Sequence, residues 1–124
     1  MANYFVSPRV KTDLRIDLAT FASNLESRWP AARIRVVSNP ASAHALEWTI
    51  LMSYGPLSGS LNREGQVMAL SGDVRDCAEF AVWARSQAPP SYTLVFYDEG
   101  YSSDVEIHEG AHPESLTEPF LIRR

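Results

Sequence analysis

The chain has 124 residues, a length typical of one domain, and its 45% hydrophobic and 21% charged residues are ordinary for a folded globular protein. This composition argues against a disordered, collagen-like or coiled-coil protein. The net charge of −4 is unevenly distributed, because residues 1–90 carry nine Lys or Arg against eight Asp or Glu, whereas residues 91–124 carry two against seven. An acidic last third disfavours direct binding to nucleic acid.

The amino terminus, MANYFVSPRVKT, lacks the basic region, apolar run and cleavage site of a signal peptide, and no apolar run approaches the ~20 residues that span a bilayer. We therefore expect a cytoplasmic protein with no membrane partner. Cys77 is the only cysteine, which excludes an internal disulfide and a cysteine-based zinc site. Because Cys77 lies on an apolar helical stripe, we interpret it as a buried core residue rather than a nucleophile.

The first half of the chain predicts a strand, a helix and two further strands. Residues 3–6 predict the first strand, and Thr12 is predicted to cap a helix whose apolar stripe runs from Leu14 to Trp29. Residues 33–37 and 46–52 then alternate polar and apolar side chains, as half-buried strands do. His44, in the loop between them, is interpreted as a surface residue with no acid nearby.

The middle of the chain predicts a hairpin followed by a second helix. Residues 57–61 and 66–70 form the two predicted strands of the hairpin. Asp73 is predicted to cap the helix, which has only a narrow polar face and ends before Pro89. Trp29, Trp48 and Trp83 lie on apolar stripes, so we expect all three in the core.

Residues 91–110 predict a closing hairpin, with the turn sequence Asp98-Glu99-Gly100 between two alternating segments. The whole order of elements indicates an α+β fold. We expect a single domain over residues 1–124, with a largely antiparallel sheet and two helices packed on one face. The tail, residues 113–124, is expected either to dock on this body or to be flexible.

The end of the closing hairpin contains the sharpest motif match. His108, Glu109 and His112 satisfy the H-E-x-x-H pattern of zinc metalloproteases, which requires both histidines on one face of a helix. Here Gly110 weakens a helix and Pro113 disfavours helical geometry at His112. We therefore predict a polar strand end running into a loop, with no catalytic residues, no metal ligands and no cofactor, and keep a metal-dependent hydrolase as the alternative.

The acidic hairpin is the candidate binding site. It combines carboxylates with tyrosines, and rigid aromatic anchors beside charged groups make a good recognition surface. The competing interpretation is a solvated hairpin tip. The candidate partner-binding residues are Tyr97, Asp98, Glu99, Tyr101, Asp104 and Glu106.

The segments EWTILMSYGPLSGSLNREGQVMALSGDVRDCAEFAVWARS and LVFYDEGYSSDVEI resemble small bacterial proteins of toxin–immunity neighbourhoods, over roughly residues 45–110. The resemblance implies a small, cytoplasmic, acidic domain that plugs the active site of a cognate toxin, and it carries no residue-level motif. Together with the acidic hairpin it favours a non-enzymatic immunity protein that binds a basic toxin such as a nuclease. A structural or regulatory module that self-associates as a homodimer is a further alternative.

Overall fold

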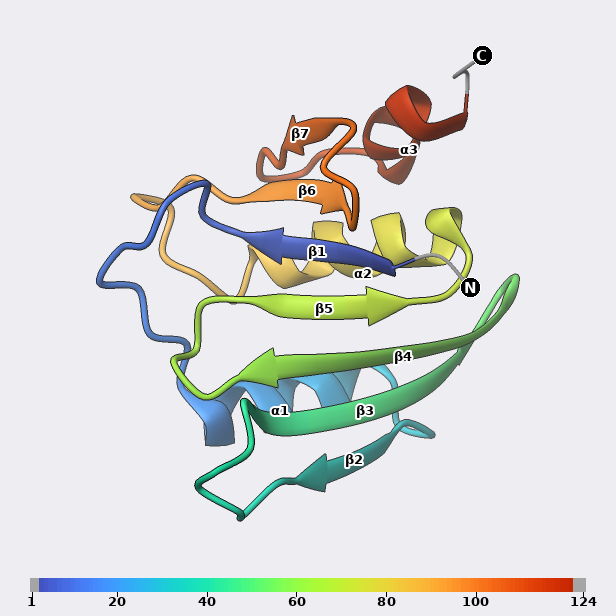
Figure 1. Ribbon diagram of the computed structural model, residues 1–124. Helices are drawn as coiled ribbons and strands as arrows, with labels where there is room; N and C mark the ends of the chain where they lie inside the picture. The colour runs from blue at the N-terminus through green and yellow to red at the C-terminus, as the bar shows by residue number, and fades with distance from the viewer. Residues whose placement is uncertain (1–2, 122–124) are drawn as a thin grey trace.

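The computed structural model describes residues 3–121 and contains one antiparallel seven-stranded sheet, in the order β2-β3-β4-β5-β1-β6-β7 (Figure 1). This confirms the predicted α+β class. Helices α1 and α2 lie behind the sheet in Figure 1, on one face, and α3 packs against α2. The elements are β1 (Asn3–Ser7), α1 (Leu18–Arg28), β2 (Arg33–Val36), β3 (His44–Met52), β4 (Gly55–Asn62), β5 (Met68–Ser71), α2 (Val74–Arg85), β6 (Val95–Asp98), β7 (Asp104–Glu106) and α3 (Pro113–Leu121).

The core lies between the sheet and its two helices. Its centre is aromatic: the ring of Trp48 on β3 lies 5.3 Å from those of Phe21 on α1 and Phe80 on α2. Trp29 and Trp83 pack on the same cluster and are partly buried. The expectation that all three tryptophans belong to the core is confirmed. Within residues 3–121, no helix has the length and apolar character needed to cross a membrane.

The predicted start of the first helix is wrong. Asp17, not Thr12, caps α1, and its carboxylate accepts a 2.9 Å hydrogen bond from Thr20 N. Leu14 and Ile16 are buried in the non-helical segment before the cap. Their two-residue spacing suits an extended chain. The run of buried apolar residues continues into the helix, but the backbone conformation changes at Asp17, so the apolar pattern alone does not mark the start of the helix.

The predicted second helix and the other strands lie near the segments that the patterns indicate, but β5 begins at Met68 rather than at residue 66, and β6 also begins late. Asp73 caps α2 through a hydrogen bond from Arg75 N, as predicted. The closing hairpin was predicted to begin near Tyr92, yet β6 begins at Val95. Tyr92 belongs to a loop because its carbonyl accepts a 2.9 Å hydrogen bond from the buried guanidinium of Arg85 instead of pairing with a strand.

Residues 113–121 of the tail dock on the body as α3. The ring of Phe120 meets those of Tyr4 and Phe96 edge-on, with centroids 5.6 and 5.5 Å apart. Leu116, on the same helix, is also buried. Docking, one of the two outcomes expected for the tail, is therefore observed for α3, whereas residues 122–124 lie outside the described chain.

Candidate functional site

The face of the sheet turned toward the viewer in Figure 1 is not covered by α1 or α2, and we call it the open face. Strand register places the open-face side chains in rows across the sheet. The first row runs Arg33, Thr49, Ser58, Ser71 and Asn3. The second row runs Arg35, Glu47, Ser60, Ala69, Phe5, Tyr97 and Asp104.

An aromatic ladder lies on the open face where β1 meets β6. The ring of Phe5 stacks on that of Tyr97 at 5.4 Å, and Tyr97 stacks on Tyr101 at 4.8 Å. The hydroxyl of Tyr97 also lies 2.8 Å from Ser7 Oγ. Two of the sequence-predicted residues thus extend an aromatic surface that begins on the first strand.

Asp104 is bound to this ladder and to the loop after β1. Its Oδ2 accepts hydrogen bonds of 3.0 Å from Arg9 Nε and 3.0 Å from the Tyr101 hydroxyl. These bonds, from Arg9 first, lower the pKa of Asp104, and the bond to Asp104 raises the pKa of Tyr101. The carboxylate therefore fixes the outer end of the ladder.

The backbone at Tyr101 is in the left-handed region, with φ 54°. An L-residue with a side chain in this conformation costs of the order of 1–3 kcal/mol, which the surrounding contacts must offset. Tyr101 is nevertheless 52% exposed. The turn therefore holds a large aromatic side chain in a strained position on the surface.

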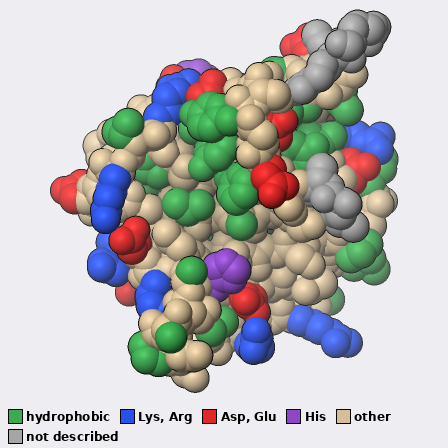
Figure 2. All heavy atoms as spheres, in the orientation of Figure 1, with side chains coloured by type: hydrophobic (Ala, Val, Ile, Leu, Met, Phe, Trp, Pro, Cys, Tyr) green, Lys and Arg blue, Asp and Glu red, His purple; other side chains and the backbone are tan. Residues whose placement is uncertain are grey.

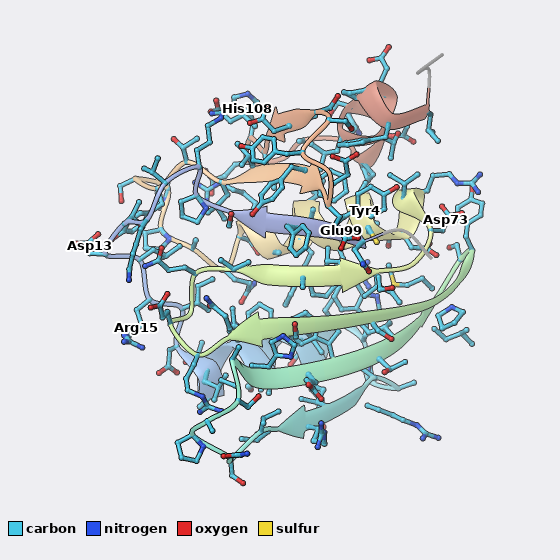
Figure 3. The ribbon with its side chains drawn as sticks, viewed as in Figure 1. Tyr4, Asp13, Arg15, Asp73, Glu99 and His108 are labelled. Carbon is cyan, nitrogen blue, oxygen red and sulfur yellow. The ribbon has the colours of Figure 1, made fainter. Side chains whose placement is uncertain are left out.

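Glu99 joins the same face from the turn. Its Oε1 accepts a 3.0 Å hydrogen bond from Asn3 Nδ2, and its backbone N–H donates to the Asn3 carbonyl oxygen at 3.1 Å. Figure 3 shows Glu99 over the start of β1, far from His108 at the upper edge of the sheet. Glu99 therefore lies where the aromatic ladder and the middle of the open face meet.

Two predicted site residues do not join this cluster. Asp98 accepts hydrogen bonds from the backbone N–H and the hydroxyl of Ser102, so its carboxylate shapes the turn. Burial opposes ionisation of Asp98, but these bonds outweigh it and lower its pKa. Glu106 lies at the far end of β7, 3.7 Å from His108 Nδ1. The candidate site therefore contains Tyr97, Glu99, Tyr101 and Asp104.

Sequence reasoning missed the contribution of the amino-terminal segment. Asn3, Phe5 and Arg9 each contact a residue of the closing hairpin that follows some 90 residues later. Their only sequence signal is the alternation of the first strand, which does not say which strand lies beside it. The pairing of β1 with β6 is what brings the two segments together.

The H-E-x-x-H segment is a turn that leads into α3. His108 and His112 are exposed, and the backbone N–H of Ala111 donates to the His108 carbonyl oxygen at 3.1 Å. Gly110 has φ 74°, in the left-handed region. The helical spacing that zinc-protease chemistry requires is absent at this segment, and among residues 3–121 no group of three His, Cys, Asp or Glu side chains is placed to hold a metal ion.

Cys77 is fully buried on α2. Burial raises the pKa of its thiol to about 12, and the negative charge of Asp76 adds to this effect. A thiol with this pKa is protonated at neutral pH and is a poor nucleophile. The interpretation of Cys77 as a core residue is confirmed.

The opposite side of the open face is basic. Arg33 and Arg35 extend from β2, and Glu47 is bound by both Arg35 and His44. These hydrogen bonds, from Arg35 first, lower the pKa of Glu47. The prediction that no acid lies near His44 is wrong, because His44 begins β3 and its Nδ1 lies 3.3 Å from Glu47. Figure 2 shows Lys or Arg side chains along this edge and uncharged atoms in the middle of the face.

No protein-family model, no curated protein sequence and no solved structure matches this chain.

Proposed function

We propose that the protein is a non-enzymatic binding module of the bacterial immunity type, which captures a basic toxin, such as a nuclease, in the cytoplasm. The observation that carries this proposal is the position of the aromatic ladder and two carboxylates on one uncovered sheet face. Phe5, Tyr97 and Tyr101 form the ladder, and Glu99 and Asp104 lie at its edges.

The ladder supplies the apolar contact that such a partner needs. Its rings are stacked on one another, so they lose little conformational freedom on binding, and tyrosines of this kind are frequent anchors of protein interfaces. Tyr101 is the most exposed of the three, at 52%. It is the residue that a partner would cover most.

Charge complementarity explains why the partner would be basic. Segment 95–109 carries five Asp or Glu and no Lys or Arg, so the hairpin attracts a cationic surface. Such complementarity speeds association by about 10- to 1,000-fold. Asp104 is partly neutralised by Arg9, whereas the group that donates to the carboxylate of Glu99 is the neutral amide of Asn3. Glu99 is therefore the principal charged contact.

The test is a quantitative capture experiment from the native host. The wild-type protein is compared with a triple variant, Glu99→Gln, Tyr101→Ala and Asp104→Asn. We expect the wild type to retain a basic protein, and the triple variant to bind it at least about tenfold more weakly and with a flatter salt dependence.

A second triple variant is the matched control. Glu26→Gln and Glu118→Gln remove the same charge from helices α1 and α3, and Tyr54→Ala removes a tyrosine that is 56% exposed on the β3–β4 turn. This control should bind like the wild type, and circular dichroism should show that both variants are folded. The proposal would be contradicted if the first triple variant, which we call the hairpin variant, bound the captured protein as tightly as the wild type does. It would also be contradicted if the wild type retained only acidic proteins.

A further inference from the structure

The middle of the open face contains a hollow of about 610 Å³. Its floor is formed by the two central strands, which carry only small side chains there: Ser58 and Ser60 on β4, and Ala69 and Ser71 on β5. The larger side chains of Phe5 and of β2 and β3 stand on either side. The volume lies in the usual range for ligand pockets, roughly 300–1,000 Å³.

Ser60 on the floor of this hollow has an unused hydrogen-bonding group. It is 7% exposed, and its hydroxyl has no hydrogen-bond partner among residues 3–121. Its hydroxyl keeps contact with solvent, so a polar group that enters the hollow can take the place of water as its hydrogen-bond partner. This side chain lines the hollow, where its hydroxyl offers one polar contact to an occupant.

The charges around the hollow select the sign of its occupant. The charge of Glu47 is compensated because the guanidinium of Arg35 binds it. Arg33 forms no ion pair within the described part of the chain, and its neighbours along the row, Thr49 and then Ser58, add hydroxyl donors. One positive charge with adjacent donors therefore faces the hollow from β2.

We propose that this hollow receives an acidic side chain of the partner protein, whose carboxylate pairs with Arg33 and accepts hydrogen bonds from Thr49 and Ser58. Ser60 then hydrogen-bonds to the backbone of the same partner segment. This inference rests on the proposed function for the existence of a protein partner, and it adds that the partner's contact surface is dipolar. Basic groups of the partner face Glu99 and Asp104, and one acidic group faces Arg33.

A second copy of the chain is a poor occupant of the same face. Two hollows placed face to face leave a void between them, and voids forfeit packing contacts. A lysine or arginine of a partner would meet Arg33 and Arg35 in the hollow. The geometry therefore points to a convex segment with a carboxylate at its tip.

The test uses two blocked tripeptides, acetyl-Gly-Glu-Gly-amide and acetyl-Gly-Lys-Gly-amide, titrated into the full-length protein and followed by ¹H–¹⁵N NMR. We expect the Glu peptide to shift the amide signals of Thr49, Ser58 and Ser60 saturably, with a Kd of the order of millimolar. Arg33→Gln should weaken this binding at least about fivefold, and Ser60→Ala about twofold. Arg15→Gln, which removes an exposed arginine outside the hollow, should not change it.

Either of two results would overturn the inference. The first is that the Glu peptide causes no saturable shift. The second is that the wild type binds the Lys peptide as well as the Glu peptide, or that Arg33→Gln binds the Glu peptide as well as the wild type does. The capture experiment separates this outcome from failure of the proposed function. If the hairpin variant loses the captured protein but Arg33→Glu keeps it, the proposed function stands and the hollow is not part of the interface. If the Glu peptide binds through Arg33 but no basic protein is captured, the hollow binds carboxylates and the proposed function fails.

Discussion

Trp48 lies directly across from Gly59 in the β3–β4 ladder, and its indole ring fills the space into which a side chain at position 59 would point. A Cβ atom on Gly59 would be 2.3 Å from Trp48 Nε1, well inside contact distance. The indole cannot easily move away, because it packs against the rings of Phe21 and Phe80. Glycine at position 59 therefore lets the central tryptophan lie close to the sheet.

Gly59→Ala is expected to destabilise the protein. The added methyl group forces the indole or the strand to shift, and overpacking of this kind costs about 1–3 kcal/mol in the free energy of unfolding. Urea denaturation measures the change. Gly100→Ala is the control, because its Cβ meets nothing within 4 Å. Equal stability of the two variants would show that the core accommodates the methyl group.

Arg63 organises the loop between β2 and β3. Its guanidinium donates hydrogen bonds of 2.9–3.0 Å to four backbone carbonyl oxygens, those of Val37, Asn39, Ser42 and His44. A lysine keeps the charge but cannot reproduce this planar set of donors. We expect Arg63→Lys to lower the free energy of unfolding by about 1–3 kcal/mol and to speed amide hydrogen exchange in residues 38–44.

The exposed Arg15 provides the comparison for this change. Arg15→Lys should alter the free energy of unfolding by less than about 0.5 kcal/mol. If amide hydrogen exchange in residues 38–44 is the same in Arg63→Lys as in the wild type, water satisfies the carbonyl oxygens and the guanidinium is dispensable.

Asp76 gives a pH-dependent contribution to stability. It is buried on α2, and its carboxylate accepts hydrogen bonds of 3.1 and 3.3 Å from Tyr54 N. Burial raises the pKa of Asp76 above its ordinary 3.8, so the folded state binds the proton more tightly than the unfolded state. The stability that Asp76 contributes is therefore complete below its ordinary pKa and is lost as pH rises through the folded-state pKa.

Asp76→Asn removes this titration while keeping an oxygen that can accept from Tyr54 N. The variant should therefore gain stability relative to the wild type as pH rises from about 3, with the difference levelling off above the raised pKa. Urea denaturation of both proteins across this range measures it. A difference that stays constant with pH, or that shrinks as pH rises, would reverse the assigned direction of the pKa shift.

Phe120 is the residue of α3 that contacts the rings of Tyr4 and Phe96. Phe120→Ala should lower the free energy of unfolding by about 1–3 kcal/mol and release α3, seen as faster hydrogen exchange in residues 113–121. The neighbouring Leu121→Ala should do neither, because Leu121 is 54% exposed. If exchange in α3 is equally slow in both variants, the helix is held by contacts other than this ring.

The local patterns of the sequence predict most of the elements but not their neighbours. Asp73 caps α2 as its side-chain chemistry indicates, and the alternation around Trp48 marks a strand. The start of α1 was misplaced because Leu14 and Ile16 are buried without being helical. Apolar spacing reports burial, and an extended segment can bury its side chains as well as a helix can.

The candidate site was predictable only in part. The turn chemistry at Asp98 and the tyrosines of the closing hairpin are visible in the sequence, and Tyr97, Tyr101 and Asp104 do lie together. Asp98 and Glu106 carry the same kind of charge but take other places, in the turn and at the far end of β7. Charge and composition do not reveal which carboxylates the local backbone already uses.

By itself, the sequence determined the α+β class, the core tryptophans and the acidic character of the closing hairpin, because each follows from periodicity, capping or composition over a short segment. Only the tertiary structure decided that β1 lies between β5 and β6, which places Phe5 beside Tyr97, and that small side chains of β4 and β5 form a hollow flanked by Arg33. Alternation says which face of a sheet a residue takes. Which strands become neighbours depends on contacts far apart in the chain, whose free energy is gained only when the whole sheet packs on its helices.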